Sequence, residues 1–325
     1  MNKLILLVFC AGMVFHVHCR ALPWPKEEAE ESRGDFSWKN RGFVSDDENS
    51  WLLQTRDSQF RTHHSGLQAH LNRIRQSSQG SPTSGSQSRH NRHRRLVFGQ
   101  DDRMCDYDIP DQLPYSALGR IGHGCTGFLI APDIVMTAAH CIYDTNGKNY
   151  LTTYGYDLDF YHRMSCSSGG DWYTWEAMGF LMAYATSGGA TQYDLGFIQL
   201  NGTVNNTEFL NLVPVNGSTE ELELPLIVPG YADDKENCQC FSECILMACP
   251  AGWPVQGEFC FDCDTFYGTS GAPLVLSSNT TVNGTALNTG KDVVGLVGSS
   301  IPSWEVNTGP KMTQEFVTRM SKIIS

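Results

Sequence analysis

The chain has 325 residues, 12 cysteines and more acidic than basic residues, 35 against 23, which gives a formal net charge of −12. Because a surface that binds nucleic acid must be basic, this balance argues against a nucleic-acid-binding protein. An apolar run from Leu4 to about Val17 is too short to span a bilayer, and no later run is long enough to do so. We therefore expect no membrane anchor.

The N-terminus has the pattern of a secretory signal peptide: Lys3, then the apolar run, then candidate cleavage points after Cys19 and Ala21. The alternative is a buried N-terminal helix. We assign residues 1–21 to a signal peptide and expect a secreted, extracellular protein, which places the cysteines in an oxidising compartment.

Residues 22–95 are rich in Ser, Gln, Arg and His, and the run 76–86 is of low complexity. This composition predicts a largely disordered pro-segment, with a possible short helix at 67–74. It ends in Arg92-His93-Arg94-Arg95, the pattern that furin-like convertases cut. The alternative is a solvated basic run. We expect a convertase to cut after Arg95 and leave residues 96–325 as the mature domain.

Charge separates the two parts of the chain. Residues 1–95 carry 14 basic and 9 acidic residues, a balance of +5, whereas residues 96–325 carry 9 and 26, a balance of −17. A basic pro-segment in front of an acidic domain is able to dock by charge, and it is equally able to serve as a spacer.

After Leu96 the chain reads as short apolar segments separated by turn residues, which predicts an all-β domain. The last segment, 312–324, has apolar residues at helical spacing and predicts a terminal amphipathic helix that packs on the core. The predicted strands are 127–130, 134–136, 195–200, 225–228, 273–276 and 293–297.

Ten cysteines remain after the signal peptide, an even number that fits a disulfide framework. Six lie within 238–263, where a zinc site is the alternative. The extracellular setting favours disulfides. Five Asn-x-Ser/Thr sequons predict exposed, glycosylated loops at Asn201, Asn205, Asn216, Asn279 and Asn283.

Three motifs bring together the groups that peptide-bond hydrolysis needs. His140 lies in Thr137–Cys141, Asp194 precedes an apolar strand, and Ser270 lies between two glycines. A nucleophilic serine, a histidine base and a carboxylate that orients the base form such a triad. Each motif alone is usually structural. The chain order His, Asp, Ser differs from that of the α/β-hydrolases and the subtilisin-like enzymes.

This order and these motifs resemble the chymotrypsin-like serine proteases, with the glutamyl-endopeptidase branch as the nearest match; Val97–Arg103 resembles the mature start of that branch and Asp264–Gly271 its nucleophile loop. The resemblance implies two six-stranded antiparallel β-barrels with the active site between them. It also implies a Cys125–Cys141 disulfide and an oxyanion hole formed by the N–H groups of Gly268 and Ser270.

The resemblance has two departures in the substrate pocket. Thr269 stands where many trypsin-like enzymes have an aspartate that binds the freed N-terminus, and Val297 stands where glutamyl endopeptidases have a histidine. Asp264 matches the position of the carboxylate that binds Arg or Lys. The residues that we expect to bind substrate are Asp264, Thr265, Val297 and Ser299.

Together these features predict a secreted, monomeric serine endopeptidase, made as a proprotein, that cuts protein or peptide substrates with a preference for Arg or Lys. The alternatives are a Glu-specific endopeptidase and a non-enzymatic binding protein on a protease fold. We expect no cofactor and no metal. The remaining histidines of the mature domain, His123 and His162, are expected in surface or loop positions.

Overall fold

The computed structural model describes residues 51–56, 97, 100–105, 111–167, 169–205, 207–215, 223–235, 238–249, 257–277, 280–282 and 285–324. The predicted signal peptide, the short helix at 67–74, the low-complexity run and the convertase site lie outside these residues. So do the sequons at Asn216, Asn279 and Asn283. Asn201 and Asn205 are described and exposed.

The first half of the domain is one sheet of eight strands, arranged in the order β1-β10-β11-β5-β4-β3-β8-β9. All of its neighbouring strands are antiparallel. The strands are β1 (Trp51–Thr55), β3 (Leu118–Ile121), β4 (Cys125–Ala131), β5 (Ile134–Thr137), β8 (Phe160–His162), β9 (Asp171–Tyr173), β10 (Trp175–Leu181) and β11 (Gly196–Leu200).

The second half is a sheet of nine strands, in the order β12-β19-β16-β13-β14-β15-β21-β20 with β2 on β14. The β12–β19 edge pair is parallel and the other pairs are antiparallel. The strands are β2 (Met104–Cys105), β12 (Asn211–Leu212), β13 (Leu224–Tyr231), β14 (Gln239–Met247), β15 (Glu258–Phe261), β16 (Pro273–Leu276), β19 (Asp292–Leu296), β20 (Ser299–Ile301) and β21 (Val306–Pro310).

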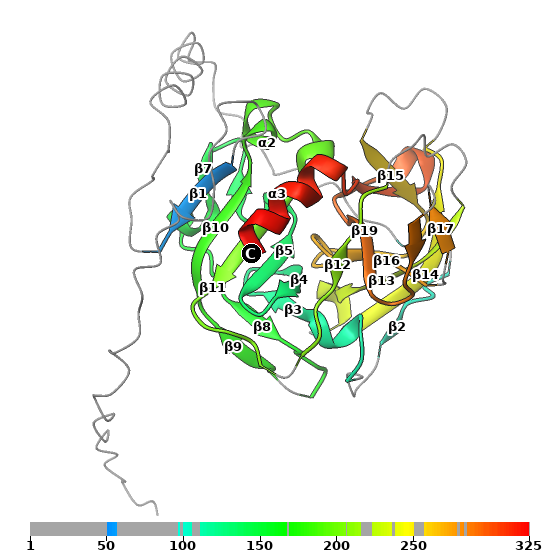
Figure 1. Ribbon diagram of the computed structural model, residues 1–325, viewed down its shortest axis with the longest axis horizontal. Helices are drawn as coiled ribbons and strands as arrows, with labels where there is room; N and C mark the ends of the chain where they lie inside the picture. The colour runs from blue at the N-terminus through cyan, green and yellow to red at the C-terminus, as the bar shows by residue number, and fades with distance from the viewer. Residues whose placement is uncertain are drawn as a thin grey trace, which may run out of the picture. The chain divides into compact units, whose positions relative to one another are not determined.

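Short elements connect and flank the sheets. Two hairpins, β6 (Tyr143–Asp144) with β7 (Asn149–Tyr150) and β17 (Thr280–Val282) with β18 (Thr285–Leu287), stand apart from them. The helices are α2 (Met182–Thr186) and the C-terminal α3 (Gln314–Ile324). Figure 1 shows β1 in blue, the other strands of the first half in teal to green and most strands of the second half in yellow to orange, with α3 in red.

The predicted strands all overlap observed ones, and the predicted terminal helix is α3. The β4–β5 hairpin shows why. Its apolar runs are buried at every position, and Pro132 and Asp133 form the turn between them. Such continuous apolar runs, bounded by turn residues, are typical of strands buried on both faces. The all-β prediction is confirmed, although the two sheets hold eight and nine strands rather than six each.

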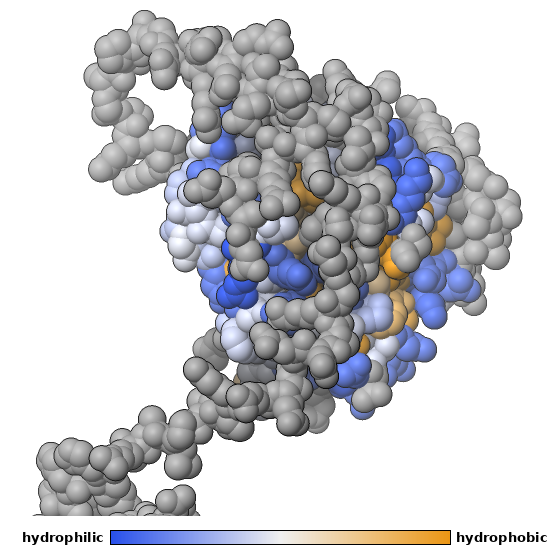
Figure 2. Space-filling view, turned by 60° about the vertical axis from the view of Figure 1, so that its left-hand side comes forward, coloured by the Kyte–Doolittle hydropathy of each residue, from blue (hydrophilic) through white to orange (hydrophobic). Residues whose placement is uncertain are grey.

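Each half has its own apolar core. Aromatic and aliphatic side chains with no exposed surface fill the first, among them Phe128, Ile134, Phe160, Phe180 and Phe197. The second is a cluster formed mainly by β13, β15, β16 and β19, which includes Leu226, Phe259, Leu274 and Val297. Figure 2 shows one face of the domain, where the visible described residues are mostly hydrophilic and hydrophobic residues occupy smaller areas between them.

One strand was not expected. Trp51–Thr55 lies in the predicted pro-segment, yet it forms the edge strand β1 of the first sheet and pairs with β10. In sequence it has only three apolar residues, Trp51–Leu53, inside a polar segment, and this run is too short for its periodicity to reveal a strand.

Candidate active site

His140, Asp194 and Ser270 meet where the two sheets adjoin. His140 belongs to a short 3-10 helix at Ala139–Cys141 that follows β5, and Asp194 directly precedes Leu195 and β11. Ser270 lies in the loop between β15 and β16. His140 Nδ1 is 2.6 Å from Asp194 Oδ2, and His140 Nε2 is 2.6 Å from Ser270 Oγ. The three side chains therefore form one hydrogen-bonded chain.

The backbone around His140 fixes its ring. Asp194 Oδ1 accepts a hydrogen bond from the backbone N–H of His140 at 2.8 Å, so both oxygens of this carboxylate hold the same residue. A disulfide joins Cys125 in β4 to Cys141, directly after the histidine. Ala138, Ala139 and Cys141 are fully buried, which leaves space only for small side chains on either side of His140.

Thr126 of β4 connects the first half to the serine loop. Its Oγ1 donates to the carbonyl of Gly268 at 2.8 Å, and its N–H donates to the carbonyl of Ser270 at 2.8 Å. The same Oγ1 accepts the N–H of Tyr231 from β13. Because three segments meet in hydrogen bonds at this buried threonine, the position of Ser270 relative to His140 is fixed.

The serine loop requires glycine at two positions. Gly268 and Gly271 have φ values of +92° and +78°, which are rarely adopted by residues with a side chain. A Cβ at Gly268 would also overlap the carbonyl oxygen of Tyr231. Among the described residues, the backbone N–H groups of Gly268 and Ser270 have no hydrogen-bond acceptor. Two such N–H groups beside a nucleophile are able to stabilise a developing oxyanion.

The triad opens into a cleft of about 650 Å³. Its described lining includes five tyrosines, at positions 143, 154, 156, 184 and 267, and three carboxylates, those of Asp144, Asp194 and Asp233. No lysine or arginine is among these lining residues, and His123 lines the cleft together with His140. The cleft is therefore aromatic and acidic.

Of the four residues expected to bind substrate, Ser299 lines this cleft and the other three do not. Val297 has no exposed surface and belongs to the apolar core of the second half. Thr265 is also fully buried. Asp264 is 5% exposed, and its Oδ2 accepts the backbone N–H of Asp102 at 3.0 Å. The chain's own segment therefore binds one oxygen of this carboxylate, and Asp264 as a substrate counter-charge stays a prediction.

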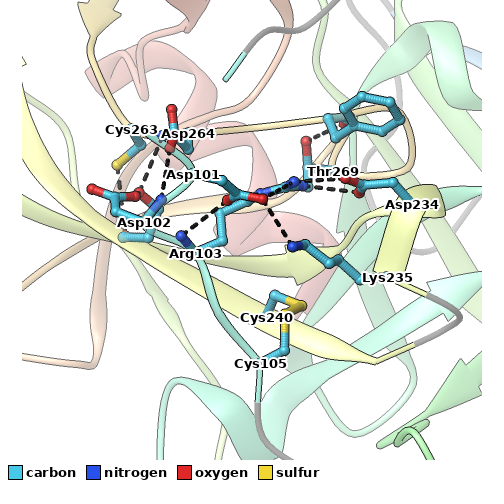
Figure 3. Close-up of polar contacts among 12 residues, drawn as sticks. Asp101, Asp102, Arg103, Cys105, Asp234, Lys235, Cys240, Cys263, Asp264 and Thr269 are labelled. Carbon is cyan, nitrogen blue, oxygen red and sulfur yellow. Dashed lines mark hydrogen bonds and ion pairs between the residues drawn. A yellow bond between two sulfur atoms is a disulfide. The ribbon is translucent and has the colours of Figure 1, made fainter. Parts of the chain in front are cut away.

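The segment Asp101–Cys105, just after the predicted mature start, packs against the serine loop (Figure 3). Arg103 has a side chain only 3% exposed and donates to both oxygens of Asp234, at 2.9 and 2.6 Å. It also donates to both oxygens of Asp101, which in turn accepts from Lys235 Nζ at 2.8 Å. The guanidinium lies 5.7 Å from the centre of the Phe266 ring.

This ion cluster, Asp101–Arg103–Asp234–Lys235, fixes the start of the domain beside the nucleophile. The pKa of Asp101 lies well below its usual value, chiefly because Arg103 donates hydrogen bonds to its carboxylate. Sequence reasoning missed the cluster. Its signals were the adjacent charges of Asp101–Arg103 and Asp233–Lys235, which are far apart in the chain.

The ten cysteines that the structure describes are all paired, and the zinc alternative is wrong for the cluster at 238–263. Besides Cys125–Cys141, the structure has the disulfides Cys105–Cys240, Cys166–Cys238, Cys244–Cys263 and Cys249–Cys260. Cys125, His140 and Cys141 lie close enough together to suggest metal ligands, but both sulfur atoms are in a disulfide and offer no thiolate.

Comparisons with known proteins agree with this geometry. The family model described as "Trypsin-like peptidase domain" matches residues 125–283. Glutamyl endopeptidase of Bacillus licheniformis is 28% identical over 194 residues, which are 58% of this chain and 57% of that protein. "Inactive serine protease 35" of Mus musculus is 39% identical over 64 residues, 19% of this chain and 15% of that protein. The chain thus spans little more than half of one relative and a small part of the other.

The comparison with solved structures gives a similar result. A solved structure of Glu endopeptidase in complex with MPD superposes with a TM-score of 0.58 at 22% identity, covering 70% of this chain and 99% of that one. Residues 125–283 therefore match a trypsin-like peptidase domain, and glutamyl endopeptidase and other chymotrypsin-fold serine proteases are homologues and structural neighbours of the chain.

Proposed function

We propose that this protein is an active serine endopeptidase in which Ser270 is the nucleophile, His140 the general base and Asp194 the carboxylate that orients it. The observation that carries the proposal is the hydrogen-bonded chain from Asp194 through His140 to Ser270, with both links at 2.6 Å. A carboxylate only accepts hydrogen bonds, so His140 carries its proton on Nδ1 and leaves Nε2 to accept from Ser270.

The reaction then follows from the positions of these atoms. Ser270 Oγ attacks the substrate carbonyl carbon while its proton passes to His140 Nε2, and the N–H groups of Gly268 and Ser270 bind the oxyanion. The C–N bond breaks as His140 returns the proton to the leaving amine. Water, deprotonated by His140, then attacks the acyl-enzyme and releases the acid and the free serine.

A peptide-hydrolysis assay tests this proposal. The secreted protein is expected to cut a peptide library, and Ser270→Ala, purified in the same way, is expected to leave the library intact. The second candidate is a non-enzymatic binding protein, which is favoured by the relative named "Inactive serine protease 35". A folded, processed wild type that cuts no peptide would select this candidate.

For specificity, we propose a preference for substrates with basic side chains near the cut bond. Asp264 does not line the cleft, but Asp144 and Asp233 do, and the domain carries a charge of −17. An acidic cleft attracts cationic peptides. The alternative, cleavage after glutamate, requires a cation that faces the substrate. Among the described lining residues only the histidines His123 and His140 are able to carry one.

We also propose that the chain is secreted and is cut after Arg95 by a furin-like convertase. The five disulfides fit an oxidising compartment, and both described sequons, at Asn201 and Asn205, are exposed as glycosylation requires. Among the described residues, no helix is long and apolar enough to cross a membrane. N-terminal sequencing of secreted material should give Leu96 or Val97. A start near Leu22 would contradict the proposed processing.

A further inference from the structure

Strand β1 lies in the predicted pro-segment, which processing after Arg95 would cut from the rest of the chain. Trp51–Thr55 lies antiparallel to β10, with Trp51 opposite Leu181 and Thr55 opposite Ala177 (Figure 1). It is an edge strand, since β10 is its sole partner among the strands that the structure describes. It therefore covers an edge of β10 that would otherwise expose unpaired backbone N–H and C=O groups.

Apolar side chains hold β1 on the domain. Leu52 is 3% exposed, which is the burial of a core residue. The Trp51 ring packs edge-on against Phe197 of β11 at 5.1 Å between centroids, and against Phe316 of α3 at 5.8 Å. The strand thus contacts three separate elements of the domain.

The residue of β10 opposite the middle of this strand is a glycine. Gly179 of β10 lies opposite Leu53, and a Cβ at this position would overlap Leu53 Cδ2 and come within 2.8 Å of Phe197 Cε1. A side chain there would push β1 away from β10, so the absence of one lets the two strands approach closely.

Polar contacts continue the docking past the end of the strand. The N–H of Arg56 donates to the carbonyl of Glu176 at 2.8 Å, and its guanidinium donates to the carbonyl of Trp175 at 3.3 Å while lying over the Trp175 ring. Gln54 Oε1 accepts from Thr152 Oγ1 at 3.0 Å. Residues 51–56 therefore form one segment that docks on the domain along all of its length.

No disulfide is able to tether this segment, because the sequence has no cysteine between Arg20 and Met104. We propose that the segment Trp51–Arg56 stays on the β10 edge after the chain is cut, so that the processed protein is a non-covalent complex of two chains. The partner of the β10 edge is the protein's own pro-segment. This inference rests on the proposed function only in that processing after Arg95 makes the cut.

The test replaces natural processing with a designed cut. A recognition sequence for a site-specific protease is inserted between Ser84 and Gly85 in a Ser270→Ala, Arg95→Ala chain with a C-terminal tag, so that neither convertase cleavage nor activity enters the result. After the cut, a denaturing gel reports cleavage, and gel filtration under native conditions reports association. We expect the N-terminal fragment to co-elute with the domain. A fragment that elutes alone while the domain stays folded would overturn the proposal.

Competition separates specific docking from charge attraction between the basic segment and the acidic domain. In this experiment the N-terminal fragment carries a label, and an excess of a synthetic peptide of residues 47–60 should displace it from the domain. The same peptide with Leu52→Asp should displace the fragment at least about tenfold more weakly, because its binding would bury an unpaired charge. A Gln54→Asp peptide is the charge-matched control at a half-buried position and should lose less. Equal weakening of the two aspartate peptides would mean that charge alone holds the fragment, and would contradict docking through β1.

Discussion

In the proposed mechanism Ser270, His140 and Asp194 act as a unit, and their variants should show it. We expect Ser270→Ala and His140→Ala each to lower kcat by about 10⁶, without further loss in the double variant. Asp194→Asn should cost about 10⁴, because an amide that donates to Nδ1 favours the wrong tautomer. Steady-state kinetics on one peptide measures all four proteins. Full activity of Asp194→Asn would show that another carboxylate orients the histidine.

Arg103 should contribute to stability far more than an exposed arginine does. Its side chain is 3% exposed and binds two carboxylates, each about one-third exposed. Arg103→Ala would leave Asp234 without the cation that it binds and Asp101 with Lys235 alone, and we expect a loss of up to about 3 kcal/mol in the free energy of unfolding. Arg319→Ala is the matched control. Its pair with Glu315 is four residues apart on α3 and should be worth about 0.5 kcal/mol. Equal losses of unfolding free energy in the two variants, measured by urea unfolding, would contradict the stabilising role assigned to Arg103.

His162 should make stability depend on pH. It is 3% exposed, not at the surface as expected from sequence, and its Nε2–H donates to the carbonyl of Ser116 at 2.8 Å. Burial lowers its pKa below the usual 6.5, although that hydrogen bond opposes the shift. The unfolded chain then binds more protons, so this contribution is full above about pH 6.5 and is lost as the pH falls.

The variant His162→Phe isolates this effect, because the Ser116 carbonyl still accepts from Thr207 Oγ1. Urea unfolding of both proteins between about pH 7.5 and 5 is the measurement, and the variant should lose less stability on acidification. Parallel pH profiles would mean that His162 does not titrate on unfolding.

At the scale of elements, α3 carries the clearest packing prediction. Phe316, Met320 and Ile323 form its buried face, as the helical spacing in the sequence indicates. Phe316 is 2% exposed, so Phe316→Ala should lower the free energy of unfolding by about 3–5 kcal/mol. Val317→Ala, at the adjacent half-buried position, should cost much less. Thermal or urea unfolding compares the two variants, and a larger loss at Val317 would contradict the observed helix face.

The elements found from sequence and the one that was missed differ in physical character. Strands β4 and β5 are adjacent in sequence, continuously apolar and joined by a turn, so local pattern predicts them. Strand β1 is five residues long and its partner β10 lies more than a hundred residues away, so only tertiary packing stabilises it. Local pattern contains no information on such a pairing.

The features of the candidate site likewise fall into those that local sequence predicts and those that depend on long-range contacts. His140 and Ser270 lie in motifs whose small neighbours follow from close packing, so the sequence predicts them. The surroundings of Asp264 did not follow from the sequence, because its carboxylate contacts Asp102, which lies far away in the chain. The disulfides within 238–263 likewise depend on the register of β14, which carries Cys240 and Cys244. These are long-range relations that residue spacing does not determine.

For the whole molecule, charge predicts how substrate choice responds to salt and to one substitution. Basic peptides should be cut faster than neutral ones at about 0.05 M salt, and this advantage should shrink at about 0.5 M as screening increases. Asp144→Asn keeps the side-chain shape and removes one cleft charge, so it should reduce the advantage at low salt. Ratios of kcat/KM report both effects. A preference for glutamate peptides, or no change in Asp144→Asn, would contradict an acidic cleft that selects basic substrates.

The central claim, an activated serine at position 270, is tested most directly by covalent labelling with a fluorophosphonate probe. The probe reacts with a serine whose base is in place, irrespective of which substrate the protein prefers. Secreted, folded wild type should be labelled, with the modification mapped by mass spectrometry to Ser270, and Ser270→Ala and His140→Ala should remain unlabelled. A folded and processed wild type that takes up no label would contradict the account and leave a protease fold without activity.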